Sequence, residues 1–274
     1  MVTFFLNYLA KHKLINMLIL CSYYLMIVLP HEKVGLAISA IFEPYSRDFY
    51  NGVIGVISIV LVVLVCILLS NNIAKHSQKK KLIIYLCIQA LLFLSGYYYL
   101  MIVNIEMIHF IQYAIFALIA YPLISHYPQL LIFTVFAGAF DEAYQYFYLS
   151  PERTNYYDFN DVILNTIGAG TGILILFTLN YFSVWKGGSK WVYISASIIV
   201  CLIILAFPLG YLYLYPRDDT NNLFALIREI PESFWSKVGK DIVYHIIRPW
   251  VGILITILLI LFYSGINYKP IAPK

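Results

Sequence analysis

Long runs of apolar residues dominate the chain and predict helices that span a membrane. A helix needs about 20 apolar residues to cross roughly 30 Å of hydrocarbon. The strands of a membrane barrel would instead alternate apolar and polar residues in segments of about ten. We therefore expect an all-α fold, a polytopic transmembrane helix bundle of about eight spans. The predicted spans lie near residues 14–29, 52–70, 82–103, 107–125, 129–148, 161–182, 191–214 and 249–266.

The spans divide the chain into two parts. Residues 1–182 hold six predicted spans and form the expected membrane core. Residues 183–274 hold two further spans and an outer amphipathic loop at about 215–248. Within that loop, apolar residues of "SFWSKVGKDIVYHII" (Ser233 to Ile247) fall roughly on one helical face, which fits a short surface helix or an ordinary solvated loop. Residues 30–51 are expected to form another outer loop.

Lysines in the short loops predict the orientation, because cytoplasmic loops carry an excess of Lys and Arg. The segment "AKHSQKKK" (Ala74 to Lys81) places four lysines between the second and third spans. With eight spans, three further sites that carry lysines fall on that same side, so both termini are predicted to be cytoplasmic. Those lysines are Lys11, Lys13, Lys186, Lys190, Lys269 and Lys274.

Composition agrees with a lipid environment. The chain is 62% apolar and 12% charged, with a mean hydropathy of +0.81. Soluble domains are about 45–50% apolar and about 25% charged. The net charge of +4 gives no indication of a nucleic-acid partner. The four cysteines lie in apolar runs without zinc-binding spacing, so we expect no disulfide and no zinc site.

Three neighbouring spans carry polar residues at their predicted outer ends. Charged groups at membrane depth are costly, so they usually face a bundle interior and mark function. With the predicted topology the polar groups of the fourth, fifth and sixth spans meet near one membrane surface and form a shared polar site. These groups are Glu106, His109 and Gln112, then Asp141, Glu142 and Gln145, then Asp158, Asp161 and Asn165.

Negative charge exceeds positive charge in this predicted site. Acids this close together cannot all ionise in a site of low dielectric without protonation or a positive partner. That partner could be Arg153, protonated His109, a metal ion or a ligand with an amine. Asp158 either joins the site or caps the sixth span, since Asp is a favoured N-cap residue.

Two glycines continue the polar stripe of the sixth span. Gly168 and Gly172 form a small-xxx-small pair, which lets helix backbones approach closely. We expect this pair to pack the sixth span against the fourth or fifth. Glycine is also common in membrane helices without such a role.

The motifs at these positions resemble the VanZ-like family of bacterial membrane proteins. The blocks are "HFIQY" (His109 to Tyr113), "DEAYQ" (Asp141 to Gln145), Arg153 and "DVILNTIGAGTG" (Asp161 to Gly172), in that order. The resemblance covers roughly residues 14–182. At Glu106 the chain departs from the family, whose members often carry Lys or another polar residue there.

The resemblance implies a bacterial inner- or plasma-membrane protein of the cell envelope, and the family is named for low-level resistance to teicoplanin. It points to six functional positions: His109, Glu142, Gln145, Arg153, Asp161 and Asn165. Of these, we expect His109, Glu142 and Asp161 as hypothetical catalytic groups and Gln145, Arg153 and Asn165 as binding groups. It supplies no reaction, and the cofactor is unknown.

Three functions stay open from the sequence. The first is an envelope protein whose acidic outer pocket binds a lipid, a cell-wall precursor or a glycopeptide. The second is an intramembrane hydrolase or transferase that uses acid–base chemistry on a lipid-linked substrate. The third, an ion-coupled transporter, is disfavoured because the acids lie near one surface and no inverted repeat is visible.

Overall fold

The computed structural model describes residues 2–101, 104–149, 157–181, 235–238, 242–245 and 247–266. Arg153 and the predicted span at 191–214 lie outside these residues. The helices are α1 (Val2–Lys11), α2 (Lys13–Val28), α3 (His31–Phe42), α4 (Arg47–Lys75), α5 (Lys79–Tyr99), α6 (Ile108–Ile124), α7 (Tyr127–Tyr144), α8 (Phe159–Thr178) and α10 (Pro249–Ser264).

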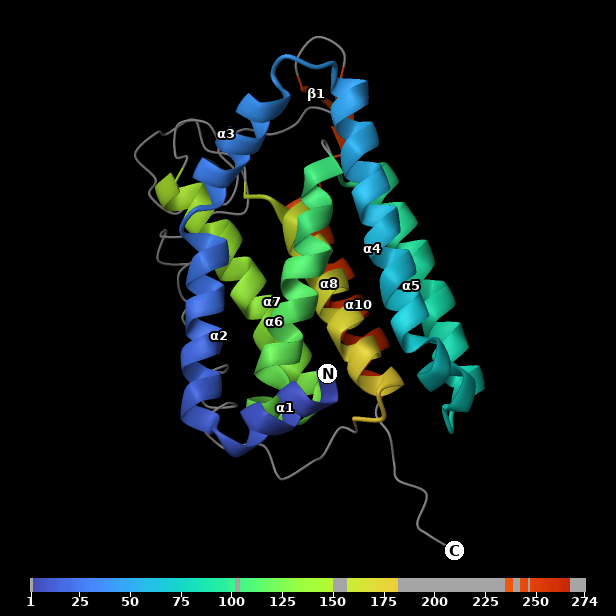
Figure 1. Ribbon diagram of the computed structural model, residues 1–274. Helices are drawn as coiled ribbons and strands as arrows, with labels where there is room; N and C mark the ends of the chain where they lie inside the picture. Colours follow the sequence, from blue (N-terminus) through green and yellow to red (C-terminus); the bar gives the residue numbers. More distant parts are fainter. Residues whose placement is uncertain are drawn as a thin grey trace, which may run out of the picture.

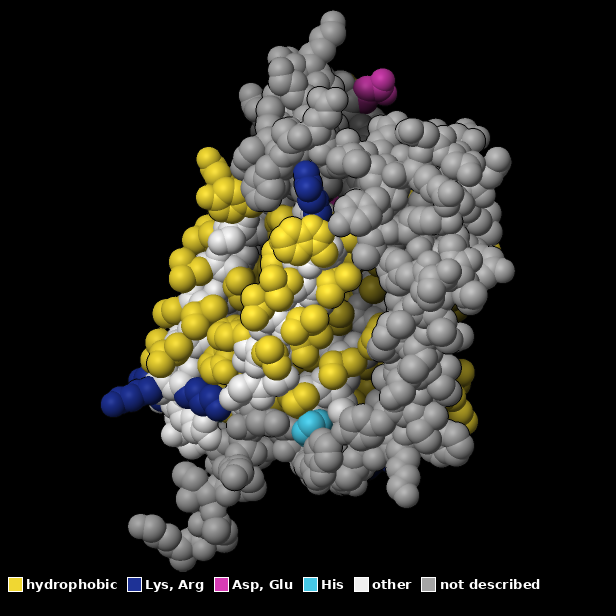
Figure 2. Space-filling view, turned by 180° about the vertical axis from the view of Figure 1, so that it is seen from behind, with side chains coloured by type: hydrophobic (Ala, Val, Ile, Leu, Met, Phe, Trp, Pro, Cys, Tyr) yellow, Lys and Arg dark blue, Asp and Glu magenta, His cyan; other side chains and the backbone are white. Residues whose placement is uncertain are grey.

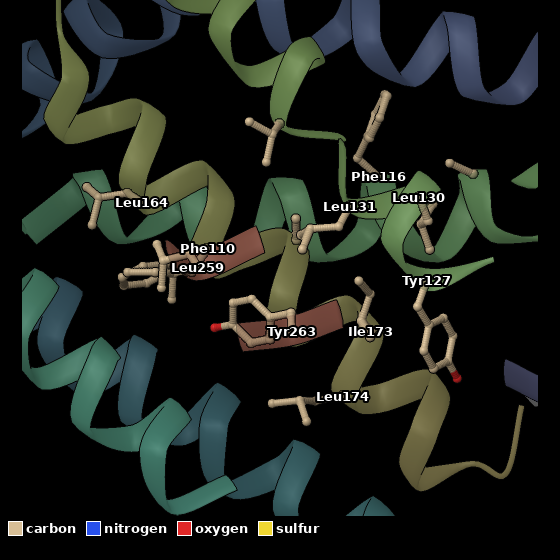
Figure 3. Packing of buried hydrophobic residues seen from close by; sticks show 14 of the residues in the cluster. Phe110, Phe116, Tyr127, Leu130, Leu131, Leu164, Ile173, Leu174, Leu259 and Tyr263 are labelled. Atoms are coloured by element: carbon tan, nitrogen blue, oxygen red, sulfur yellow. The ribbon is translucent and has the colours of Figure 1, made fainter. Parts of the chain in front are cut away.

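Helix α8 is the centre of the bundle. It contacts α5, α6, α7 and α10, and 83% of its most apolar window is buried (Figure 1). Around it, Phe110 of α6, Leu164 of α8 and Leu259 of α10 belong to one apolar cluster, shown with its neighbours in Figure 3. α8 is therefore surrounded by protein, which explains how it can carry polar side chains that lipid would not tolerate.

Four helices are long and apolar enough to cross a membrane. They run over Phe49–Lys75, Lys79–Tyr99, Ile105–Ile124 and Phe159–Thr178. The bent pair Lys13–Val28 and Lys33–Phe42 makes a fifth if it is one span, and Pro249–Ser264 is a shorter apolar helix. These helices show a membrane protein, whereas the count of about eight spans and the orientation of the termini stay predictions.

Helix α4 is the most exposed of the long helices. None of its most apolar window is buried, although its mean hydropathy there is 3.3. The face of the molecule seen from behind in Figure 2 also carries a broad hydrophobic surface, with Lys and Arg side chains toward its ends. An apolar surface of this kind fits contact with lipid acyl chains.

The two ends of the bundle differ in charge. The start of α2, the end of α4 and the start of α5 lie at the lower end of Figure 1. These helix termini are Lys13, Lys75 and Lys79. α6 and α8 begin at the upper end, and α7 ends there. We call the segment Ala74 to Lys81, which joins α4 to α5, the lysine-rich loop. In the described residues, the polar ends of α6, α7 and α8 thus lie at the opposite end of the bundle from this loop.

Two predicted outer loops are corrected by the structure. Residues 30–51 were expected to be a loop, but α3 and the first turns of α4 lie there. Ser46 caps α4, because its side chain accepts a hydrogen bond from the Phe49 N–H at 3.2 Å. Pro30 separates α3 from α2 and explains the break, since proline cannot donate the helix hydrogen bond.

The expected surface helix within Ser233 to Ile247 is wrong for the described residues. They form an antiparallel pair of strands, β1 (Trp235–Val238) and β2 (Ile242–His245), in which Trp235 pairs with His245 and Val238 with Ile242. Both segments contain β-branched and aromatic residues, which fit strands better than helices, and Gly239 follows the first.

Candidate functional site

Helix α6 places one histidine between two polar residues of α8. His109 is only 2% exposed and lies in the first turn of α6. Its Nδ1 is 2.8 Å from Oδ1 of Asn165, and its Nε2 is 3.6 Å from Oδ2 of Asp161. Since residues four apart share a helix face, Asp161 and Asn165 can hold both nitrogens of one imidazole.

Helix α7 adds two adjacent buried acids. Asp141 is 0% exposed and Glu142 is 3% exposed. The Gln145 side-chain amide donates to both carboxylates, at 3.2 Å to Asp141 Oδ1 and 3.3 Å to Glu142 Oε1. Gln145 begins a π-helical turn (Gln145–Leu149), a local widening that is frequent at functional sites.

A tyrosine that was not singled out as a site residue joins α6 to α7. The Tyr113 hydroxyl donates to Asp141 Oδ2 at 3.0 Å, and Tyr113 is fully buried. Tyr113 stands four residues after His109, on the same helix face, inside the motif "HFIQY". That spacing was the available signal, but a tyrosine in an apolar helix is indistinguishable from a core residue by sequence.

Asp158 is the N-cap of α8. Its carboxylate accepts the backbone N–H of Asn160 at 2.9 Å and that of Asp161 at 3.4 Å. Asp158 therefore caps α8, and it also lies close enough to interact with the Glu142 carboxyl, so the two alternatives do not exclude each other. Desolvation, reinforced by the charge of Asp161, raises the pKa of Asp158 to about 7.

Glycines bring the three helices close enough for these contacts. A Cβ on Gly168 would lie 2.8 Å from the Phe110 carbonyl oxygen, and one on Gly172 would lie 2.6 Å from that of Ala114. Both positions thus press α8 against the backbone of α6. On α7, a Cβ on Gly138 would lie 3.0 Å from Cβ of Asn165.

The carboxyls from α7 and α8 form one electrostatic cluster. The Glu142 carboxyl interacts with the charges of Asp161, Asp141 and Asp158. We call these four acids with His109, Asn165 and Gln145 the polar cluster. Arg153, the predicted positive partner, lies outside the described residues.

A second histidine lies beside the polar cluster. The ring centroid of His31 is 5.8 Å from that of His109, and His31 also interacts with the charge of Asp141. It opens α3, in the segment expected to be a loop. No sequence pattern connected it with residues about 80 positions later.

Other predicted features are not part of the polar cluster. Gln112, expected on the face of His109, makes no side-chain hydrogen bond to the cluster within the described part of the chain, and its Oε1 is buried without a partner there. Among the same residues, no group of three or more His, Cys, Asp or Glu could hold a metal ion.

Long apolar helices around a buried polar cluster define the class of the chain as a helical membrane protein. Residues 53–180 match the family model described as VanZ/LLP1. Over these residues the chain is similar to the VanZ-like family, which confirms the resemblance seen in the motifs. The match begins later than the expected residue 14. No curated protein and no solved structure matches the chain.

Proposed function

We propose that this VanZ-like protein acts in the bacterial envelope by binding a cationic or hydrogen-bond-donating group at the polar cluster. The observation that carries the proposal is that four carboxyls from α7 and α8 interact with one another, with Asp161 lying 3.6 Å from His109 of α6. Isolated buried acids are costly, and a cluster of this kind is favourable when a positive or donor group is present.

The chemistry of the polar cluster limits the ligand. Gln145 and Tyr113 already donate to Asp141, and Asp158 accepts two backbone N–H groups. Asp161 has a single side-chain partner among the described residues, His109 at 3.6 Å. A ligand ammonium or hydroxyl would therefore interact most strongly with Asp161. Such groups occur in lipid headgroups, cell-wall precursors and glycopeptides such as teicoplanin.

The test is a pair of isosteric substitutions, Glu142→Gln and Asp161→Asn, in a strain that depends on this protein for glycopeptide resistance or envelope-stress tolerance. We expect each variant to lower resistance to the level of a strain without the protein, at unchanged membrane abundance. Glu43→Gln is the matched control, because Glu43 is an exposed acid outside the polar cluster. Full resistance in both cluster variants would contradict the proposal.

A second candidate, an intramembrane acid–base enzyme, is favoured by one observation. His109 is held between Asp161 and Asn165, an arrangement that fits a general base or acid. The nucleophile would be water, since the polar cluster contains no serine or cysteine. Turnover of a lipid-linked substrate by purified protein, lost in His109→Gln, would establish this candidate over simple binding.

A further inference from the structure

We propose that Asn165 is a positioning residue that fixes His109 in the Nδ1–H tautomer, so that Nε2 is the basic nitrogen of the site and shares one proton with Asp161. The role of this tautomer in ligand binding rests on the proposed function. The tautomer itself can be measured without knowing the ligand.

The first step is the orientation of the Asn165 side-chain amide. Within the described residues, its buried Nδ2 has no hydrogen-bond partner of ordinary geometry. The Asn165 side chain interacts with the Glu142 carboxyl, and Nδ2 is the only donor that it can offer there. An amide flip would exchange Oδ1 and Nδ2 and place Oδ1 next to that carboxyl. Two hydrogen-bond acceptors would then face each other, which is unfavourable. The Oδ1 atom is therefore the end that meets His109.

The second step follows from the 2.8 Å contact between Asn165 Oδ1 and His109 Nδ1. An amide oxygen can only accept, so the hydrogen must be on Nδ1. In a neutral imidazole the other nitrogen then carries the lone pair. Nε2 is therefore the atom that can accept or release a proton.

The third step concerns Asp161, whose Oδ2 lies 3.6 Å from Nε2. A lone pair opposite an ionised carboxylate repels it, and a proton on either group turns that repulsion into an attraction. The pair therefore holds one proton, as an imidazolium with a carboxylate or as a neutral imidazole with a carboxylic acid. Both members are buried or half-buried, which strengthens this preference.

This arrangement names the chemical class of the ligand. A hydroxyl or ammonium group can take the place of the shared proton by donating to Asp161 or to Nε2. A group that only accepts hydrogen bonds would leave the acids unpaired. The other titratable groups that surround His109 set the proton affinity of the pair and must be kept in any test: His31 from α3, Asp141 and Glu142 from α7, and Asp158 from α8.

The experiment is nitrogen NMR of the purified full-length protein labelled with ¹⁵N-histidine, with His109→Gln used to assign the His109 signals. We expect a protonated Nδ1 at every pH at which the protein is folded, and a pyridine-type or imidazolium Nε2. In Asn165→Leu, which removes the acceptor at similar volume, the neutral ring should change to the Nε2–H tautomer. In Asn165→Asp, which restores an acceptor, the Nδ1–H form should return.

Two outcomes would overturn the inference. One is a neutral Nε2–H tautomer in the unmodified protein, and the other is an unchanged tautomer in Asn165→Leu. If the leucine variant does not fold, the unmodified protein and Asn165→Asp still decide, since both must show Nδ1–H. If the tautomer is as expected while Glu142→Gln and Asp161→Asn keep full resistance, the proposed function fails and the inference stands.

Discussion

At the scale of single residues, the structure turns a list of polar side chains into a set of defined partners. Gln145 bridges Asp141 and Glu142, Tyr113 donates to Asp141, and His109 lies between Asp161 and Asn165. The buried acids are thus not equivalent. Among the described residues, Asp141 has two side-chain donors, whereas Asp161 has one histidine.

Removing the Tyr113 hydroxyl should therefore weaken the junction of α6 and α7. Tyr113→Phe leaves Asp141 with one hydrogen-bond donor fewer. We expect the free energy of unfolding to fall by about 1–3 kcal/mol, as for a hydrogen bond to a charged group. Tyr23→Phe is the matched control, because its hydroxyl donates to a backbone carbonyl, that of Gln112, and should cost about 1 kcal/mol. Unfolding of both variants in detergent measures the difference.

Asp158 should make stability depend on pH. Its pKa is raised to about 7 in the folded protein from an ordinary value of 3.8. Between these two values the folded state binds more protons than the unfolded state, so the contribution of Asp158 to stability falls as pH rises from about 4 to 7. Above pH 7 it no longer changes.

Asp158→Asn keeps an N-cap oxygen and removes the titration. Between pH 4 and pH 7, we expect the free energy of unfolding of the unmodified protein to fall by more than about 1 kcal/mol relative to that of this variant. Unfolding curves at several pH values provide the measurement. Parallel pH profiles for the two proteins would show that the raised pKa of Asp158 does not contribute.

At the scale of elements, close approach between α8 and α6 determines which side chains meet. Gly168 and Gly172 lie where a Cβ would overlap backbone atoms of α6. The rotation of α8 that buries these glycines also directs Asp161 and Asn165, on the same stripe, toward His109. On its other side, α8 accepts the Tyr263 ring of α10 against Gly170, and the Tyr263 hydroxyl bonds to Gln89 of α5.

Gly172→Ala should consequently separate α8 from α6. The new methyl would lie 2.6 Å from a backbone oxygen, which cannot move away by a change of rotamer. We therefore expect the free energy of unfolding to fall by about 1–3 kcal/mol. Gly52→Ala in α4 has no described residue within 4 Å of the new methyl and should be neutral or stabilising by about 0.5–1 kcal/mol. Thermal unfolding compares them, and equal stability of the two variants would contradict the packing role.

The loop between α4 and α5 is held to the other end of α8. His76 is 4% exposed, and its Nε2 is 2.9 Å from the Phe177 carbonyl oxygen. Its Nδ1 accepts the Gln78 N–H at 3.1 Å, so Nε2 carries the hydrogen and donates to Phe177. The lysine-rich loop is therefore fixed relative to the core, which makes it a suitable position for testing topology.

At the scale of the whole molecule, the lysine-rich loop and the polar cluster lie at opposite ends of the bundle (Figure 1). If that loop is cytoplasmic, the polar cluster is near the outer surface. We predict that Ser77→Cys, in a protein without native cysteines, reacts with a membrane-impermeant maleimide only after permeabilisation. Glu43→Cys, exposed at the end of α3, should react in intact cells. Labelling of Ser77→Cys from outside would reverse the orientation.

Much of the architecture follows from the sequence because its cause is local. Apolar runs predicted seven of the described helices, α2, α4, α5, α6, α7, α8 and α10, since each run must cover its own backbone in lipid. The sequence also showed the three polar helix ends and the VanZ-like motifs at His109, Glu142 and Asp161. Successive spans run in opposite directions, so the order of the spans alone predicts that these three polar ends lie on the same side.

Only the tertiary structure decided which polar atoms meet. Side-chain partners depend on how far each helix is rotated about its axis. The rotation of α8 is set by contacts of Gly168 and Gly172 with a helix about 58 residues away in sequence. His31 reaches the site because α3 follows a break at Pro30, and Trp235–Val238 pairs with Ile242–His245 as strands. These outcomes depend on packing between distant segments, which local hydrophobic patterns do not encode.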